Sequence, residues 1–191
     1  PSAGGAVYSP AMTDFVIMVE KAGTMYVTGP EVVKTVLGEE VSFEDLGGAM
    51  AHGTKSGVAH FVAKNEYDCF DKIRTLLSYI PSNNTEEAPH VTTDDDPNRM
   101  DHNLINKIPE NSLQPYDMKE ILLSVVDNNQ LFEVHELFAQ NVIVGFARMN
   151  GRTVGIVANQ PMYLAGALDI DSSSKASRFI RYCDAFNIPI I

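Results

Sequence analysis

The hydrophobic and polar positions near the start of the chain predict a repeating order of strand, strand and helix. Apolar runs at Phe15–Val19 and Met25–Val27 are suited to buried strands. A helix is expected to begin near Pro30 and to end at Gly38, because proline favours the first helical turn and glycine the position after the last. Ser42 and the acidic residues after it indicate a second helix start.

A polar segment punctuated by glycine, His52–Gly57, follows and is expected to be a loop. Two interpretations stay open for it: a ligand loop in which Lys55 meets a phosphate, or a solvated turn, which this composition favours. Beyond it, Val58–Val62 is a short predicted strand. A helix over 65–80 follows, and its apolar residues recur at helical spacing and are expected to form a core face: Phe70, Ile73, Leu76 and Leu77.

The clearest local signal is a hairpin in the second half. The β-rich runs Val142–Met149 and Thr153–Ala158 are joined by Asn150-Gly151, the pair that favours a type I′ turn. Around it the pattern predicts further elements: a helix at Met118–Val126, a strand at Leu131–Val134, a small-residue turn at Leu164–Leu168, a helix capped by Ser172, Ser173 or Ser174, and a buried strand at Ile188–Ile191.

A polar, acidic and proline-containing stretch separates the two halves and is expected to be a linker. We therefore expect one domain over 1–81, the linker over 82–116 and a second domain over 117–191. Hairpin, small-residue loop, helix and strand recur on both sides, which indicates an α/β fold of duplicated ββα units. The chain begins inside a glycine motif and ends on an apolar strand, so we expect it to be part of a longer polypeptide.

Charge and cysteine content narrow the functional classes. The net charge of −11 argues against nucleic-acid binding and against docking on an anionic membrane. Only two cysteines are present, so a reducing cytoplasm is the expected compartment. His52 and His60 lack partners at metal-ligand spacing and are expected to be structural or surface residues. The aspartates at 94–96 are interpreted as solvated, and no metal site is predicted.

The small residues Ala3, Gly4 and Gly5 contribute little to a core and cost backbone entropy. They suit a place where a ligand lies against the main chain. A turn of this kind opening into a helix directs N–H groups outward, where they can hold an oxygen that gains negative charge. The alternative is a close helix–strand crossing at which nothing larger than glycine fits.

The motif Ala-Gly-Gly-Ala-Val-Tyr-Ser-Pro-Ala-Met-Thr-Asp-Phe at Ala3–Phe15 resembles the N-domain oxyanion motif of biotin-dependent acyl-CoA carboxyltransferases. These are the carboxyltransferase (β) subunits of propionyl-CoA carboxylase and their relatives in methylmalonyl-CoA decarboxylase and transcarboxylase. The resemblance extends in order along the chain, through Tyr26–Pro30, Ser56–His60, Leu77–Pro81, Gln114–Met118, Val154–Pro161 and Cys183–Pro189.

The resemblance implies two crotonase-like (ClpP/crotonase) domains, each a superhelix of ββα units, of which this chain holds parts. It implies that the backbone amides of Gly4 and Gly5 form the oxyanion hole for an acyl-CoA thioester, and that Ala6, Asn159 and Gln160 contribute to cofactor binding. For Asn159 and Gln160 the alternative is a set of backbone hydrogen bonds that closes the hairpin. A second hole, for the biotin ureido oxygen, belongs to a Gly-Gly-Ala-Tyr-like motif that is not in this sequence, so these residues alone are expected to be inactive.

The implied chemistry moves CO2 between carboxybiotin and a short acyl-CoA, propionyl-CoA or methylmalonyl-CoA. The implied partners are a biotin carboxyl carrier protein, a biotin carboxylase or decarboxylase subunit, and further copies in a hexamer. The implied location is the cytoplasm, or the mitochondrial matrix in a eukaryote, or attachment to a membrane decarboxylase complex.

Two alternatives stay open. Another crotonase-fold acyl-CoA enzyme, a hydratase or biotin-independent decarboxylase, would need a carboxylate acid–base pair that the sequence does not show. A non-catalytic assembly module would fit the incomplete site.

Overall fold

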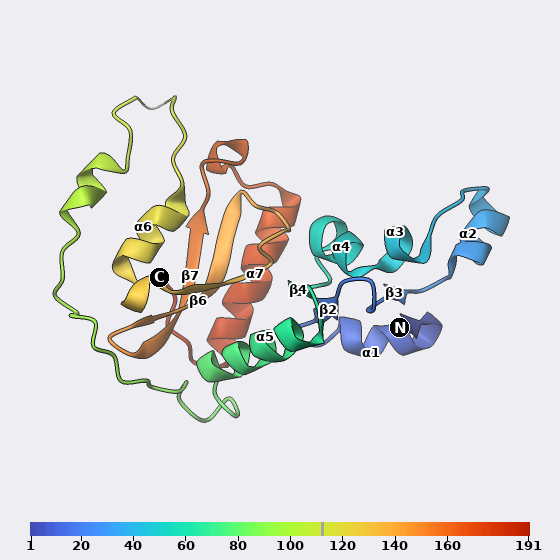
Figure 1. Cartoon of the computed structure of the whole chain (residues 1–191), viewed down its shortest axis with the longest axis horizontal. Helices are drawn as coiled ribbons and strands as arrows, with labels where there is room; N and C mark the ends of the chain where they lie inside the picture. The colour runs from blue at the N-terminus through green and yellow to red at the C-terminus, as the bar shows by residue number, and fades with distance from the viewer. Residues whose placement is uncertain (112) are drawn as a thin grey trace. The chain divides into compact units, whose positions relative to one another are not determined.

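The computed structural model describes residues 1–111 and 113–191 (Figure 1). The chain forms two compact units. The first unit comprises Pro1–Arg74 together with His135–Phe138, and the second comprises Thr75–Val134 together with Ala139–Ile191. The short segment His135–Phe138 therefore packs with the first unit although its neighbours in sequence belong to the second.

The first unit is built from short elements. In chain order they are β1 (Ser2–Ala3), the 3-10 helix η1 (Gly4–Val7), α1 (Tyr8–Ala11), β2 (Ile17–Val19), β3 (Met25–Tyr26), α2 (Pro30–Leu37), α3 (Phe43–Gly47), α4 (Ala49–Ala51), the π-helix η2 (His52–Ser56), β4 (Phe61–Ala63) and the start of α5 (Glu66–Tyr79). Strand β1 pairs in parallel with β3, and β2 pairs in parallel with β4. The core between them consists of small and aliphatic residues: Val7, Val16, Met18, Met25, Ala49 and Ala59.

Local signals placed the helix ends of this unit correctly. Helix α2 begins at Pro30 and is followed by Gly38 in the left-handed conformation, with φ +72°. Helix α3 begins after Ser42, whose side chain accepts a hydrogen bond from the Asp45 N–H. Each of these signals lies within a few residues of the helix end that it determines.

Three predictions for this part of the chain are wrong. The hairpin expected in the first half does not form, because β2 and β3 each take a parallel partner from elsewhere in the chain. Residues His52–Ser56 form a π-helical turn and not a loop. On α5 the buried residues are Leu76 and Tyr79, whereas Phe70 is 52% and Leu77 59% exposed. Helical spacing shows which residues share a face but not which face is covered.

The second unit has a three-stranded antiparallel sheet in the order β5-β6-β7. Its elements are the end of α5, η3 (His102–Asn106), α6 (Met118–Val125), η4 (Asp127–Asn129), β5 (Leu131–Val134), β6 (Val142–Met149), β7 (Arg152–Asn159), η5 (Leu164–Gly166) and α7 (Ile170–Ala185). The hairpin prediction is confirmed: Met149 pairs with Arg152, and Asn150 and Gly151 between them have φ values of 51° and 76°.

Helix α7 lies along β6 and β7 (Figure 1). The Phe146 and Phe179 rings meet with centroids 5.0 Å apart. The cap of α7 is Asp169 and not one of the serines. The Asp169 side chain accepts from the Ser172 N–H, and the Ser172 hydroxyl accepts from the Asp169 N–H, which makes a reciprocal capping box. After α7 the chain returns to β7, where the Ile191 N–H donates to the Gly155 carbonyl at 2.9 Å, so the predicted last strand does pair. Its end is exposed and not buried as predicted, because the described chain offers no cover for Ile191.

Part of the predicted linker is fixed to the second unit by hydrogen bonds. The Val91 N–H donates to the Gly151 carbonyl at 3.0 Å, and the Asn128 N–H donates to the Asp95 carboxylate at 2.7 Å. The boundaries of the two domains and the linker remain predictions.

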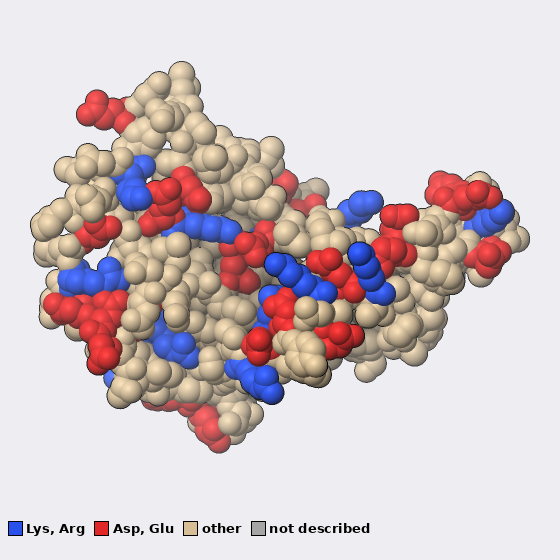
Figure 2. Space-filling view, viewed as in Figure 1, with Lys and Arg blue, Asp and Glu red and all other residues tan. Residues whose placement is uncertain are grey.

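Acidic and basic side chains lie interspersed on the face drawn in Figure 2. None of the helices found in residues 1–111 and 113–191 has the length and apolarity that a bilayer crossing requires.

Candidate active site

The glycine turn, Gly4–Gly5, lies directly after β1 and opens η1. Gly4 has φ +59°, a left-handed conformation in which an L side chain is strained. Gly5 is exposed, and a Cβ built on it meets no atom within 4 Å. Within the described chain, a side chain at position 5 would meet no clash. Packing therefore does not explain the glycine there, which argues against the alternative of a tight helix–strand crossing at this residue.

The backbone of this turn is exposed at Gly5 and Ala6 and is supported by the core at Val7. The first N–H groups of a helix have no partner within that helix, so η1 does not use the amides of Gly4 and Gly5 in its own hydrogen bonds. Ala6 is exposed beside them, and Val7 is buried and anchors η1 in the core of the first unit. An open face with main-chain amides on a fixed support is what stabilisation of an oxyanion requires.

The π-helical turn η2 lies beside this region of the first unit. His52 Nε2 lies 2.6 Å from the carbonyl oxygen of Met25 in β3, and His52 Nδ1 lies 2.7 Å from Ser56 Oγ. Lys55 is exposed in the same turn. Sequence reasoning assigned no role to the contact between His52 and Met25, because it joins residues far apart in sequence.

His60 is a buried structural residue, in keeping with its prediction. Its Nδ1 accepts a hydrogen bond from the Val16 N–H at 3.1 Å, so the ring helps to align β4 with the chain before β2. The His60 and His135 rings stack with centroids 4.1 Å apart, and His135 Nε2 donates to the Gly57 carbonyl at 2.8 Å. These contacts hold the segment His135–Phe138 in the first unit.

The predicted site residues of the second unit differ in how they are held. Gln160 is only 3% exposed, and both ends of its amide are bonded: Nε2 donates to the Asp117 carboxylate at 2.6 Å, and Oε1 accepts from the Met118 N–H at 3.1 Å. Gln160 thus fixes the start of α6 to the end of β7 through its side chain. Asn159 is exposed, and its amide packs against Gly166, where an added Cβ would lie 3.2 Å from Asn159 Nδ2.

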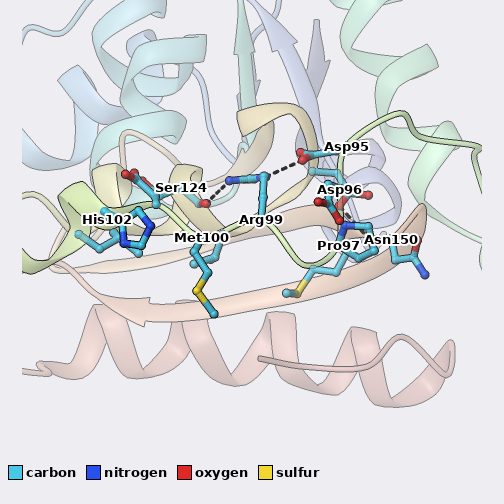
Figure 3. Close-up of a pocket in the computed structure, with 13 residues that line it drawn as sticks. Asp95, Asp96, Pro97, Arg99, Met100, His102, Ser124 and Asn150 are labelled. Carbon is cyan, nitrogen blue, oxygen red and sulfur yellow. Dashed lines mark hydrogen bonds and ion pairs between the residues drawn. The ribbon is translucent and has the colours of Figure 1, made fainter.

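The second unit also contains a pocket of about 550 Å³ between the acidic stretch after Thr93 and the end of α6 (Figure 3). Arg99 crosses it, with Nη1 and Nη2 donating to the Ser124 and Val126 carbonyls at 2.5 and 2.8 Å. Its Nε donates to Asp95. The backbone N–H of Asn128, with help from Arg99, holds the pKa of Asp95 below its usual range. Because these polar groups bond one another, we interpret the pocket as a structural support for the hairpin.

The two thiols are poorly suited to nucleophilic catalysis. Burial raises the pKa of Cys183 to about 12, and burial also raises the pKa of Cys69. A thiol with a raised pKa forms little thiolate near neutral pH. Within residues 1–111 and 113–191, His, Cys, Asp and Glu side chains form no cluster of three or more that could hold a metal ion.

Comparison with known proteins places the chain in a family. Residues 1–191 match the family model described as the carboxyl transferase domain, and the chain belongs to this family. Over its whole length it is 59% identical to the methylmalonyl-CoA decarboxylase subunit alpha of Veillonella parvula and 53% identical to the propionyl-CoA carboxylase carboxyltransferase subunit of Haloferax mediterranei.

A solved structure agrees closely with the fold. The transcarboxylase 12S structure, described as a hexamer assembly with hydrolysed methylmalonyl-coenzyme A bound, superposes on the whole chain with a TM-score of 0.96 at 46% identity. The fold is therefore crotonase-like α/β, as the sequence predicted. The chain spans 38% and 37% of the two curated relatives and 37% of the solved chain.

Proposed function

We propose that this chain is part of a biotin-dependent carboxyltransferase that moves a carboxyl group between carboxybiotin and a short acyl-CoA, with propionyl-CoA and methylmalonyl-CoA as the acyl-CoA pair. The observation that carries the proposal is the match of all 191 residues to the carboxyl transferase domain, with relatives named for propionyl-CoA and methylmalonyl-CoA at above 50% identity. Structural relatives with hydrolysed or intact methylmalonyl-coenzyme A bound support the same acyl-CoA.

In this proposal the amides of Gly4 and Gly5 hold the thioester oxygen. That oxygen gains negative charge when the α-proton leaves the acyl group, and two fixed N–H donors lower the energy of this charge. The open face at Gly5 leaves room for the thioester, and Val7 in the core keeps the donors in place. Ala6 and Asn159 are each proposed to contribute to cofactor binding. Gln160 is proposed to act there only through the start of α6.

Biotin, on a carrier protein, would supply an activated carboxyl group and a ureido nitrogen that can accept a proton. The chain's own contribution is to bind and orient the acyl-CoA and to stabilise the oxyanion, which requires no side-chain nucleophile. The partners we propose are a biotin carboxyl carrier protein, a biotin carboxylase or decarboxylase subunit, and further copies of the chain in a hexamer. We propose a cytoplasmic location, or attachment to a membrane decarboxylase complex.

The test compares two glycine variants in the full-length subunit with its biotin-bearing partner. Gly5→Val should lower the transfer rate at least tenfold, because a side chain would fill the space that the thioester needs. Gly29→Ala is the matched control: a Cβ there meets only the Tyr26 ring, at an ordinary 3.8 Å. Transfer of labelled carboxyl from carboxybiotin to propionyl-CoA is the assay. Wild-type rates for Gly5→Val would sink the oxyanion assignment.

The direction of transfer has two candidates. The relative at 59% identity is named a methylmalonyl-CoA decarboxylase subunit, which favours transfer from methylmalonyl-CoA to biotin. The relative at 53% identity is named a propionyl-CoA carboxylase subunit, which favours the reverse. Measuring both rates in the same full-length complex would separate them.

A further inference from the structure

We propose that His52 is a positioning residue for the Gly4–Gly5 turn and that it acts through the outer edge of β3. The proposal rests on the proposed function in one respect only, namely that this turn is the oxyanion hole. His52 is not proposed to touch the substrate.

The path from His52 to the glycine turn is short. Strand β1 ends one residue before Gly4, and its only strand partner within the described residues is β3, with Ser2 opposite Met25 and Ala3 opposite Tyr26. The Ser2 N–H donates to the Thr24 carbonyl at 2.7 Å. The place of Gly4 and Gly5 therefore depends directly on the place of β3.

The pair β1–β3 is too small to hold itself in place. Each strand is two residues long, and isolated two-stranded sheets are marginal even when longer. Successive carbonyls of a strand point to opposite edges. Since the Thr24 carbonyl faces β1, the Met25 carbonyl faces the outer edge of β3, where a third strand would normally bond it.

A single antiparallel bridge, between Thr24 and Gly48, begins to cover this edge, and His52 bonds the next carbonyl along it. The Met25 carbonyl oxygen can only accept, so His52 Nε2 must carry the proton and donate to it, at 2.6 Å. The Ser56 hydroxyl lies 2.7 Å from Nδ1 and can donate to it, which fixes the ring in this tautomer. Ser56 in turn accepts from the Val58 N–H at 3.3 Å.

The π-helical turn brings the histidine and the serine together. His52 and Ser56 are the first and last residues of η2, and π-helical turns are rare and frequently mark functional sites. The end of α3 also packs closely against this carbonyl, since a Cβ on Gly47 would lie 2.2 Å from the Met25 oxygen. The Met25 carbonyl is thus fixed by close packing and by one directed hydrogen bond.

The test uses His52→Leu, His52→Gln and Ser56→Ala in the full-length complex. His52→Leu removes the donor and should lower kcat about tenfold with KM for the acyl-CoA changed less than about twofold, because a displaced donor weakens the transition state more than substrate binding. His52→Gln keeps an N–H at similar reach and should recover most of kcat. Ser56→Ala should give an intermediate loss of about threefold.

Thr54→Ala is the matched control: it removes a 2.7 Å bond to the Met50 carbonyl in the same turn and should behave as wild type.

A second readout does not depend on activity. Hydrogen exchange of the segment Pro1–Val7 should be faster in His52→Leu than in wild type and near wild type in His52→Gln. The proposal is overturned if His52→Leu keeps the wild-type kcat, if exchange of this segment is unchanged, or if Thr54→Ala reproduces the loss. A wild-type complex without carboxyl transfer would instead refute the proposed function, and the exchange result alone would then decide whether His52 positions the turn.

Discussion

Gly155 determines how closely α7 approaches the sheet. A Cβ on this residue would lie 2.7 Å from Cys183 Sγ and 3.2 Å from Phe179 Cε1. Both are buried side chains of α7. The absence of a side chain in the middle of β7 is therefore what permits the contact on which the core of the second unit depends.

Gly155→Ala is predicted to lower the free energy of unfolding by about 1–3 kcal/mol, the usual cost of overpacking a close-packed core. Urea unfolding followed by circular dichroism would measure it. The double variant Gly155→Ala with Cys183→Ala should recover part of the loss, because it removes the nearest clashing atom. Additive losses in the double variant would contradict the proposed clash.

At the scale of elements, α6 and the hairpin are joined to the preceding acidic stretch through Asp95. Its carboxylate accepts from the Asn128 N–H and from Arg99, and Arg99 also bonds two carbonyls at the end of α6. A cation at a helix C-terminus and an anion on a free N–H are both favourable. This arrangement explains why a polar segment expected to be a linker follows a defined path.

Asp95→Asn is predicted to destabilise the second unit near neutral pH and to have little effect in acid. The folded-state pKa of Asp95 is lowered, chiefly by the Asn128 N–H. The stabilisation is therefore present above the unfolded pKa of about 3.9 and is lost as pH falls through the folded value. The urea midpoints of wild type and variant should differ at pH 7 and converge as the pH falls below the folded-state pKa of Asp95. Asp94→Asn, a like charge change at an exposed neighbour, serves as the control and should leave the midpoint unchanged at both pH values.

Short-range elements could be predicted from the sequence, and long-range contacts could not. The Asn150-Gly151 hairpin, the Ser42 cap and the Gly38 terminus depend on residues within a few positions of one another. The parallel pairs β1–β3 and β2–β4, the bond from His52 to Met25 and the bond from Asn128 to Asp95 join distant residues, and no local pattern specifies them. The fold class was predicted because family resemblance carries that long-range information.

At the scale of the whole molecule, the chain holds the residues proposed for the acyl-CoA oxyanion and lacks the motif that the resemblance assigns to the biotin oxyanion. We therefore predict that a polypeptide limited to residues 1–191 has no measurable carboxyl transfer, while a full-length subunit with its partners does. The assay of labelled carboxyl transfer, run on both proteins at equal concentration, checks this. Equal rates would show that one oxyanion hole suffices.

The place of His135–Phe138 in the first unit changes how this polypeptide can be divided. The His135 N–H bonds the His60 carbonyl at 2.9 Å, and the Phe138 ring lies where a Cβ on Gly57 would be. A cut anywhere within 82–116 would leave the first unit without this segment. The two pieces would then behave as complementing fragments, because the first piece would lack His135–Phe138, which belongs to its compact unit.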